Sequence, residues 1–292
     1  METEGQVRGT LFLVGTPIGN LGDMSTRAIE VLRTADLIAA EDTRTTAMLL
    51  EHYGITGAKV LPNHKFNEKN AAYGFVQDLL AGKNVALVTD AGMPCISDPG
   101  YLLVEACVEA GVPVTAVPGA CAAVCAAALS GFNTLSFAFY GFLPRSAGDI
   151  RKVLARVEKE YSPLSIFYES PNRILDTVEL VSRTLPGCRV CVCNDLTKKF
   201  ERVYRGTPTE VLAELKNNPN AAKGEYVLLI ERQKTEDASS DALSPEAVLV
   251  DCMVKRGVTA KEAVSLLTAE KVLPKRELYD AALRLRKVWN EE

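Results

Sequence analysis

The chain has 292 residues, 47% of them hydrophobic and 24% charged, and a formal net charge of −4. This composition is globular and excludes a disordered, collagen-like or coiled-coil chain. No apolar run approaches the roughly 20 residues that a membrane-spanning helix requires, and residues 1–9 lack the apolar core of a secretory signal. The sequence therefore predicts a cytoplasmic protein with no membrane partner, whose 8 cysteines stay reduced.

The charge is unevenly distributed along the chain. Residues 1–144 carry 8 Lys and Arg against 14 Asp and Glu, whereas residues 145–232 carry 15 against 12 and residues 245–290 carry 9 against 6. We expect a nucleic-acid partner to meet the two later segments, where positive charge is in surplus. Offsets of this size are also typical of ordinary solvated surface, so charge alone leaves both interpretations open.

Strands and helices are expected to alternate over residues 1–118. Apolar β-type runs at 10–14, 37–40, 85–88 and 113–117 predict strands, and apolar residues at helical spacing predict helices near 26–35 and 100–110. This alternation is typical of an α/β domain with a largely parallel sheet. Such sheets bind ligands at the loops that follow their strands, which are here residues 15–23, 41–46 and 90–98.

A second α/β domain is expected over residues 119–232. Its predicted strands are 164–168, 190–193 and 226–231, and its predicted helices lie near 149–160, 172–184 and 208–217. Residues 233–244 are polar and without periodicity, which predicts a linker. Residues 245–292 then predict a small C-terminal helical domain with helices at 245–255, 259–270 and 274–288, the second of which begins with a capping-box pattern.

The loop after the first strand resembles a phosphate-binding loop only superficially. Gly15 and Gly19 are four residues apart, but the chain has no GxGxxG pattern there and no Gly-Lys-Ser/Thr follows. Pro17 also removes a backbone donor. A nicotinamide-dependent dehydrogenase and a nucleoside triphosphatase are therefore disfavoured.

Two acidic loops are the stronger candidates for chemistry. Glu41, Asp42 and Arg44 place two carboxylates and a guanidinium at a strand end, which indicates either substrate positioning or a helix cap with an ion pair. The segment 90–100 combines Asp90 and Asp98 with several Gly and Pro residues, and we expect its acids to accept ligand hydroxyls or amines.

Metal binding is not expected. Cys188, Cys191 and Cys193 have a superficial metal-ligand spacing, but the last two alternate with Val192 on a predicted strand and no second thiol pair has zinc spacing. Buried core thiols are the preferred interpretation. His64 is one of only 2 histidines, and a structural role and a catalytic role remain equally open for it.

Two basic segments are candidates for RNA contact. Residues 198–205 interleave cations with aromatic rings, a pattern suited to single-stranded nucleic acid, although an amphipathic strand with a solvated face fits equally well. Residues 145–152 form a basic loop that could close over a substrate. The candidate RNA-binding residues are Arg145, Arg151, Lys152, Lys198, Lys199 and Arg202.

Six segments occur in a specific order along the chain: Val14–Asp23, Ala40–Arg44, Asp90–Gly92, Ser97–Gly100, Tyr168–Pro171 and Lys223–Glu225. Together they closely resemble the small-subunit ribosomal RNA cytidine-2′-O-methyltransferases, a family within the tetrapyrrole methylase superfamily. The resemblance covers about residues 10–232, and residues 245–292 look like the helical domain appended in that family.

The resemblance implies two α/β domains of the tetrapyrrole methylase type with S-adenosyl-L-methionine in the cleft between them. It also implies a homodimer, and as substrate a cytidine ribose in the decoding region of 16S rRNA in the small ribosomal subunit. By motif position, the implied cofactor neighbours are Ile18, Asp90, Met93, Cys121, Ala122, Tyr168, Leu196 and Glu225. Our hypothesis for the substrate is that Glu41, Asp42 and Arg44 position the nucleotide, with Asn20 and Glu68 lining the same pocket.

Other activities stay open at this point. A corrin or porphyrin methylase or a diphthine synthase would share the fold, and a non-catalytic RNA-binding protein would share the basic segments. Asn172 stands where the family usually has His, so no proton acceptor is named. The C-terminal helices could grip an RNA backbone or pack on the body as a lid.

Overall fold

The computed structural model describes residues 8–158, 162–232, 244–270 and 272–289. The chain divides into two compact units, residues 1–233 and 234–292, each of which is considered by itself. The expected linker, residues 233–244, lies outside the described residues except for Ser244. Among the described helices, none is both long and apolar enough to cross a membrane.

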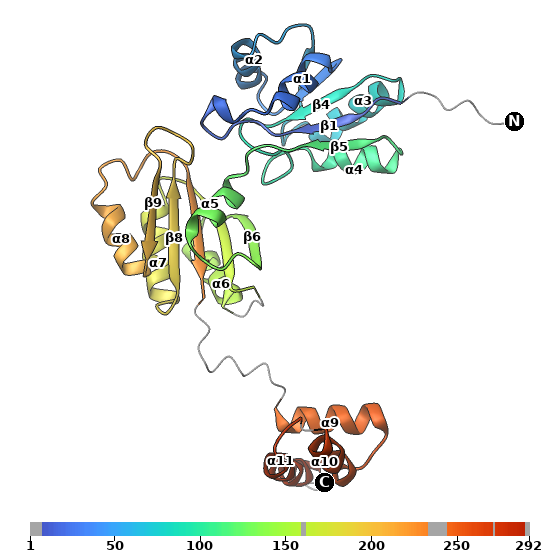
Figure 1. Cartoon of the computed structure of the whole chain (residues 1–292), viewed down its shortest axis with the longest axis vertical. Helices are drawn as coiled ribbons and strands as arrows, with labels where there is room; N and C mark the ends of the chain where they lie inside the picture. The colour runs from blue at the N-terminus through green and yellow to red at the C-terminus, as the bar shows by residue number, and fades with distance from the viewer. Residues whose placement is uncertain (1–7, 159–161, 233–243, 271, 290–292) are drawn as a thin grey trace, which may run out of the picture. The chain divides into compact units, whose positions relative to one another are not determined.

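The first α/β domain is a five-stranded parallel sheet with helices on both faces (Figure 1). Its elements are β1 (Leu11–Val14), η1 (Leu21–Asp23), α1 (Thr26–Thr34), β2 (Leu37–Ala40), α2 (Thr43–His52), β3 (Lys59–Pro62), α3 (Glu68–Leu80), β4 (Val85–Val88), α4 (Tyr101–Glu109) and β5 (Val114–Val117). The strand order is β3-β2-β4-β1-β5. The predicted parallel sheet is thus confirmed.

The two faces of this sheet are covered by different helix pairs. Helices α1 and α2 pack on one face through residues such as Leu32 and Leu50, and α3 and α4 pack on the other through residues such as Phe75 and Leu103. β2 and β4 are buried along their whole length, as expected for strands covered on both sides. All five strands run in one direction, so the loops that follow them meet at one edge.

The second α/β domain contains a mixed sheet of order β6-β7-β10-β8-β9. Its elements are α5 (Ala122–Ser130), β6 (Phe137–Phe142), α6 (Ala147–Val157), β7 (Leu164–Glu169), α7 (Ile174–Thr184), β8 (Arg189–Asn194), β9 (Arg202–Gly206), α8 (Pro208–Lys216) and β10 (Tyr226–Glu231). Only β6 and β7 are parallel, and the other pairs are antiparallel. Helices α6, α7 and α8 cover one face, and α5 packs on the other.

The cysteines of β8 belong to the core of this domain. Cys191 and Cys193 have no exposed surface, and they pack with α5 while Val190 and Val192 pack on the opposite face. Their sulfur atoms lie 3.9 Å apart. No group of His, Cys, Asp and Glu side chains suited to a metal ion occurs in the described part of the chain.

The second unit is a bundle of three helices, α9 (Pro245–Arg256), α10 (Ala260–Ala269) and α11 (Lys275–Trp289) (Figure 1). It has a core of its own that includes Leu249, Leu267 and Leu278. The predicted capping box is present, because Thr259 and Glu262 exchange hydrogen bonds at the start of α10. All three C-terminal helices were predicted within one residue at each end.

Candidate functional site

A cavity of about 380 Å³ lies at the carboxyl edge of the first sheet, where residues of the second domain complete its wall. This edge is where open parallel sheets bind ligands, and the volume is that of a small-molecule site. The eight implied cofactor neighbours all line the cavity: Ile18, Asp90, Met93, Cys121, Ala122, Tyr168, Leu196 and Glu225. Residues that lie far apart in the sequence are therefore brought together as the resemblance implied.

The loop after β4 supplies much of the first-domain wall. Thr16 and Gly92 pair through two backbone hydrogen bonds of 2.9 and 3.1 Å, which tie this loop to the loop after β1. Cys95 and Ser97 both have φ of 69°, a conformation that side chains with a Cβ adopt at a cost. Strained backbone of this kind is typical of ligand sites, where it fixes the direction of neighbouring side chains.

Two glycines allow β1 and β5 to end in contact with each other. A Cβ on Gly15 would lie 2.6 Å from the Cα of Gly119, and a Cβ on Gly119 would lie 2.7 Å from the Cα of Gly15. Because the obstructing atoms are backbone, neither strand end can yield by a change of rotamer. The contact sets the start of the segment that carries Cys121 and Ala122 into the cavity wall.

Three carboxylates converge on this wall. Glu41 accepts hydrogen bonds from the Thr89 hydroxyl and from the backbone N–H of Asp90, at 3.3 Å for the latter. Burial and the nearby Glu41 charge raise the pKa of Asp98 to about 6, and the same two causes raise the pKa of Asp90. A negative, partly desolvated wall favours a cationic ligand or one that donates hydrogen bonds.

Tyr168, Glu169 and Ser170 form the second-domain wall at the end of β7. The Tyr168 hydroxyl accepts a hydrogen bond of 3.3 Å from the N–H of Ala123 at the start of α5, and burial raises the pKa of this phenol.

Glu169 is only 2% exposed. It accepts hydrogen bonds from the Thr177 hydroxyl and the Ser170 N–H, and pairs with Arg173. Glu169 therefore stabilises the turn after β7, and its carboxylate oxygens are already engaged by these partners.

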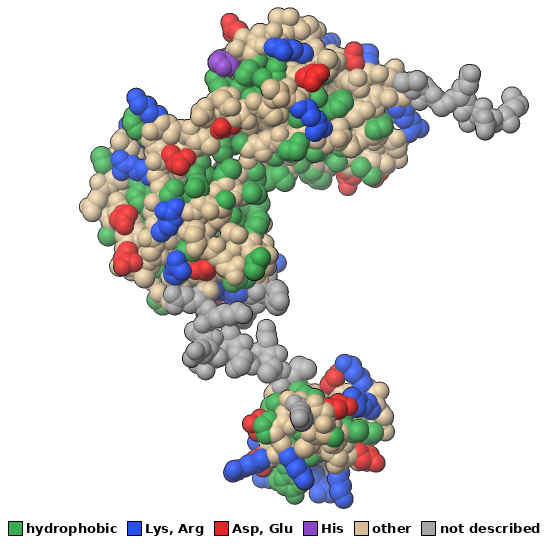
Figure 2. All heavy atoms as spheres, viewed as in Figure 1, with side chains coloured by type: hydrophobic (Ala, Val, Ile, Leu, Met, Phe, Trp, Pro, Cys, Tyr) green, Lys and Arg blue, Asp and Glu red, His purple; other side chains and the backbone are tan. Residues whose placement is uncertain are grey.

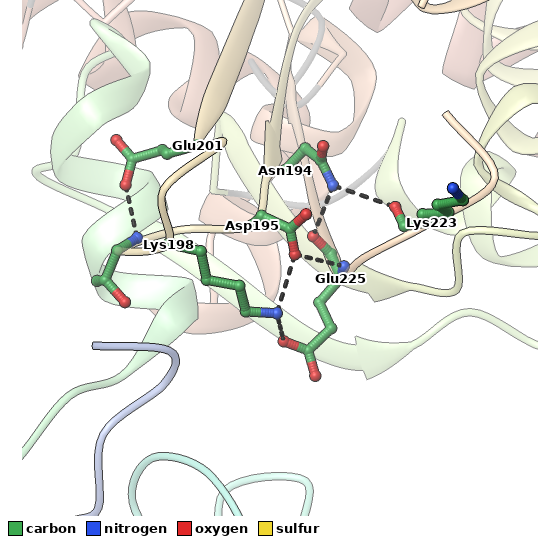
Figure 3. Close-up of polar contacts among 7 residues, drawn as sticks. Asn194, Asp195, Lys198, Glu201, Lys223 and Glu225 are labelled. Atoms are coloured by element: carbon green, nitrogen blue, oxygen red, sulfur yellow. Dashed lines mark hydrogen bonds and ion pairs between the residues drawn. The ribbon is translucent and has the colours of Figure 1, made fainter. Parts of the chain in front are cut away.

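Lys198 links Asp195 to Glu225, which is one of the residues that line the cavity. Figure 3 shows the Lys198 ammonium between Asp195 and Glu225, at 2.9 and 2.8 Å from their carboxylate oxygens. Partial burial lowers the pKa of Lys198, but the hydrogen bonds to the two carboxylates outweigh it and raise the pKa overall. A Cβ on Gly224, where φ is 85°, would lie 2.3 Å from the Asp195 carboxylate.

The same lysine also touches the first domain. A Cβ on Gly19, in the loop after β1, would lie 2.5 Å from the Lys198 Cγ. The charge of Lys198 is compensated by two carboxylates, and its assignment as an RNA contact stays a prediction. The position of this lysine fixes Glu225, one of the lining residues.

Four of the five predicted substrate-positioning residues lie outside the cavity lining, and only Glu41 is part of it. Asp42 caps α2 and pairs with Arg44, whose side chain is 88% exposed. The loop predicted for residues 41–46 is thus shorter, since α2 already begins at Thr43. This is the helix-cap arrangement that the sequence left open.

Asn20 and Glu68 do not line this cavity, and their role toward the substrate stays a prediction. Asn20 caps η1 by accepting a hydrogen bond of 2.9 Å from the N–H of Gly22. Glu68 is buried and accepts hydrogen bonds of 2.7 and 3.0 Å from the N–H groups of Gly100 and Leu102 at the start of α4. Both side chains are occupied by backbone donors.

The other predicted RNA contacts lie on the surface of the second domain. The loop expected over residues 145–152 is wrong, because α6 already begins at Ala147. Arg145, Arg151 and Lys152 are exposed, and Lys152 pairs with Asp149 at 2.9 Å. Lys199 is exposed and lies 5.5 Å from the centre of the Phe200 ring, and Arg202 is exposed at the start of β9. These five cations remain available at the surface.

Some lining residues were not assigned to the site from the sequence. Asp98 was recognised only as one acid of a ligand-binding segment, and Phe142 was not singled out at all. Phe142 ends an edge strand whose exposed residues give no clear alternation, so its only signal was the Gly and Pro content of the turn around it.

Comparison with known proteins identifies the family of this chain. Residues 10–212 match the family described as Tetrapyrrole (Corrin/Porphyrin) Methylases. The chain is 42% identical over 279 residues to the Ribosomal RNA small subunit methyltransferase I of Escherichia coli O157:H7, covering 94% of this chain and 95% of the relative. It is 41% identical over 277 residues to the protein of that name from Halalkalibacterium halodurans, covering 94% of each.

Solved structures support the fold alone. The methyltransferase CobJ aligns with a TM-score of 0.56 at 17% identity, covering 78% of this chain and 96% of that one. A diphthine synthase aligns with a TM-score of 0.57 at 16% identity, covering 80% and 94%. The chain therefore belongs to the tetrapyrrole methylase family of S-adenosylmethionine-dependent methyltransferases, and within it to the ribosomal RNA small subunit methyltransferase I group.

Proposed function

We propose that this protein transfers a methyl group from S-adenosylmethionine to the ribose 2′-hydroxyl of a cytidine in the decoding region of 16S rRNA. The observation that carries the proposal is the acid-walled cavity of about 380 Å³ lined by all eight implied cofactor neighbours. The names of the relatives specify ribosomal RNA of the small subunit. The proposed place of action is the cytoplasm, where that RNA is assembled into the small subunit.

The residues that line the cavity fit the cofactor. Ile18, Met93 and Leu196 offer apolar contacts that exclude water, and Asp90 and Glu225 offer carboxylates to the hydroxyl and amino groups of a ligand. When bound, the cofactor supplies a methyl group activated by a positively charged sulfonium. The negative wall around Glu41, Asp90 and Asp98 complements such a charge.

The chain's own contribution is to orient the ribose and to accept its proton. Holding two reacting groups in line is worth about 7–11 kcal/mol in favourable cases. We assign the proton acceptor to Asp98, because a pKa of about 6 leaves it ionised near neutral pH yet more basic than an ordinary aspartate. Glu41, fixed by Thr89 and Asp90, is the positioning residue beside it.

The expected assembly is a homodimer formed through the second domain. Apolar side chains are exposed on α5, on edge strand β6 and on the segment between them, and Figure 2 shows hydrophobic groups gathered over this region. They are Val124, Leu129, Leu135, Phe137 and Phe142. Exposed apolar patches and unpaired strand edges are features that association covers.

The test is transfer of labelled methyl groups to purified small ribosomal subunits from cells that lack this modification. We expect label in the 16S rRNA and none in large subunits. Glu41→Gln should lower turnover by more than it weakens cofactor binding, since Glu41 lines the cavity but is not among the eight implied cofactor neighbours. Cofactor binding without transfer to any subunit would contradict the proposal and favour a tetrapyrrole or protein substrate.

A further inference from the structure

The turn after β3 lies at the same edge of the first sheet as the cavity. β3 pairs with β2, and β2 ends immediately before Glu41. The backbone N–H of Asn63 donates a hydrogen bond of 2.7 Å to the carbonyl of Ala40, the last residue of β2. Residues 63–67 thus begin one strand away from the acidic wall.

This turn is firmly held from both ends. Asn67 accepts a hydrogen bond of 2.8 Å from the N–H of His64 and donates one of 3.0 Å to the carbonyl of Pro62. The next residue, Glu68, is fixed by its two hydrogen bonds to the start of α4. The turn therefore presents its outward side chains in a defined direction.

The outward side chain at the tip of this turn is an aromatic ring. Phe66 is 95% exposed, and the nearest ring is that of His64, whose centre lies 6.2 Å away at an angle of 64°. Burying a phenylalanine is favourable by about 1.5–3 kcal/mol, so an exposed ring on a held turn is a feature that packing within this chain does not explain.

The charges beside the ring are positive. Lys65 and Lys69 are exposed, and neither has an ion-pair partner among the residues that the structure describes. They stand out because the surrounding segment, residues 1–144, has 14 acidic against 8 basic residues. Two free cations beside a free ring suit the phosphates and a base of single-stranded RNA.

Unpartnered polar atoms lie beneath the same turn. Both amide atoms of Asn63, which is 1% exposed, and the Nδ1 of His64 are buried without a hydrogen-bond partner in the described chain. These atoms lie beneath the turn, so a molecule that meets its outer face contacts the exposed ring and the two lysines rather than them.

We propose that the turn 63–67 is a nucleotide subsite, in which a base next to the target cytidine stacks on Phe66 while Lys65 and Lys69 contact its flanking phosphates. The inference rests on the proposed function, because it supplies the same RNA substrate with a second anchor outside the cavity. A neighbouring base that stacks on Phe66 would hold the RNA strand near the cavity. The target ribose could then approach the acidic wall without contacts to its own base.

The test measures equilibrium binding of unmodified small subunits to the full-length protein. We expect Phe66→Ala to weaken binding by about tenfold, since stacking of one base is typically worth that much. Phe66→Trp should bind as the wild type does, whereas Phe66→Leu should resemble Phe66→Ala. Cofactor affinity should stay unchanged in all three variants. Tyr73→Ala, which removes another exposed aromatic ring from α3, is the matched control.

A second arm examines the lysines. Lys65→Ala and Lys69→Ala should each reduce the slope of log affinity against log salt by about 1. The proposal is overturned if Phe66→Ala binds like the wild type. It is also overturned if Phe66→Leu binds like the wild type, because an aliphatic side chain would then suffice and the contact would be an apolar one with protein. Binding does not require turnover, so wild-type protein that binds subunits without methylating them would count against the proposed function and not against this subsite.

Discussion

At the scale of single residues, the acidic wall of the cavity lowers the stability of the fold and at the same time makes one of its carboxylates more basic. Asp98 is placed where burial and the Glu41 charge raise its pKa to about 6. A carboxylate with a raised pKa destabilises the folded state once the pH exceeds the value in the unfolded chain, because the unfolded chain then ionises more readily. The same shift makes it a better proton acceptor.

Asp98→Asn should therefore lower activity and raise stability together. We expect kcat to fall by about 10²–10⁴-fold, the range typical of a lost general base. In the wild type, kcat should rise with pH through about 6, and this rise should vanish in the variant. The melting temperature of the variant should exceed that of the wild type at pH 8 but not at pH 3, where Asp98 is protonated in both states.

The control is Glu30→Gln, which removes an exposed carboxylate from α1 and should change neither the pH profile nor the melting temperature. An Asp98→Asn variant with unchanged kcat and an unchanged pH profile would remove Asp98 from the mechanism.

At the scale of elements, the contact between the ends of β1 and β5 depends on two residues without side chains. Gly119→Ala would place a Cβ 2.7–2.9 Å from three backbone atoms of Gly15. Overpacking of this kind typically costs about 1–3 kcal/mol. We expect a loss of that size in the free energy of unfolding and weaker cofactor binding, because Cys121 and Ala122 follow directly.

A second glycine provides the matched control. Gly74 lies inside α3, where an added Cβ would meet no atom within 4 Å. Gly74→Ala should stabilise the protein by up to about 1 kcal/mol through helix propensity. Denaturant unfolding of the two variants distinguishes the effects, and equal changes of stability would contradict the account of the strand contact.

The elements that the sequence predicted well are those with a strong pattern. The central strands β2, β4 and β10 match their predicted ranges to the residue, because they are continuous apolar runs bounded by turns. The edge strands β3 and β6 were not predicted, since they are partly exposed and show no regular alternation. Helix α5 was also missed, because its run of small apolar residues has no polar face to reveal a helical period.

The site was predictable in a different way. The proposed cofactor neighbours came from motif order through the family resemblance, and all eight line one cavity, although their role in binding stays a prediction. Asn20 and Glu68 do not line the cavity: Asn20 caps its own turn through the N–H of Gly22, whereas Glu68 accepts from backbone donors that only folding brings close. For Glu68 those donors lie more than thirty positions away, at Gly100 and Leu102. The boundary between the two α/β domains at residues 118 and 119 stays a prediction.

At the scale of the whole molecule, the helical unit folds around its own core. Its expected surplus of positive charge includes exposed Lys275, Arg276 and Arg286 on α11. Deleting residues 245–292 should leave cofactor affinity unchanged and weaken subunit binding, with a smaller salt dependence. Calorimetry with the cofactor and binding of subunits at several salt concentrations test this. Lost cofactor binding would instead indicate that the helices act as a lid.

The proposed dimer makes a separate prediction. Phe137→Glu puts a charge on the exposed edge strand β6, where we expect the second copy to pack. Light scattering should report a dimer for the wild type and a monomer for this variant. Val108→Glu, at an exposed position on α4, should remain dimeric. A wild-type protein that is monomeric at all concentrations would refute the dimer.

The most direct measurement of the central claim is the chemical position of the transferred methyl group. Small subunits lacking the modification are methylated by the purified protein, and their 16S rRNA is digested to nucleosides for mass spectrometry. The account predicts one new 2′-O-methylcytidine, with the methyl on the ribose and the nucleotide in the decoding region. A methyl group on a base, or on a ribose elsewhere in the RNA, would contradict it.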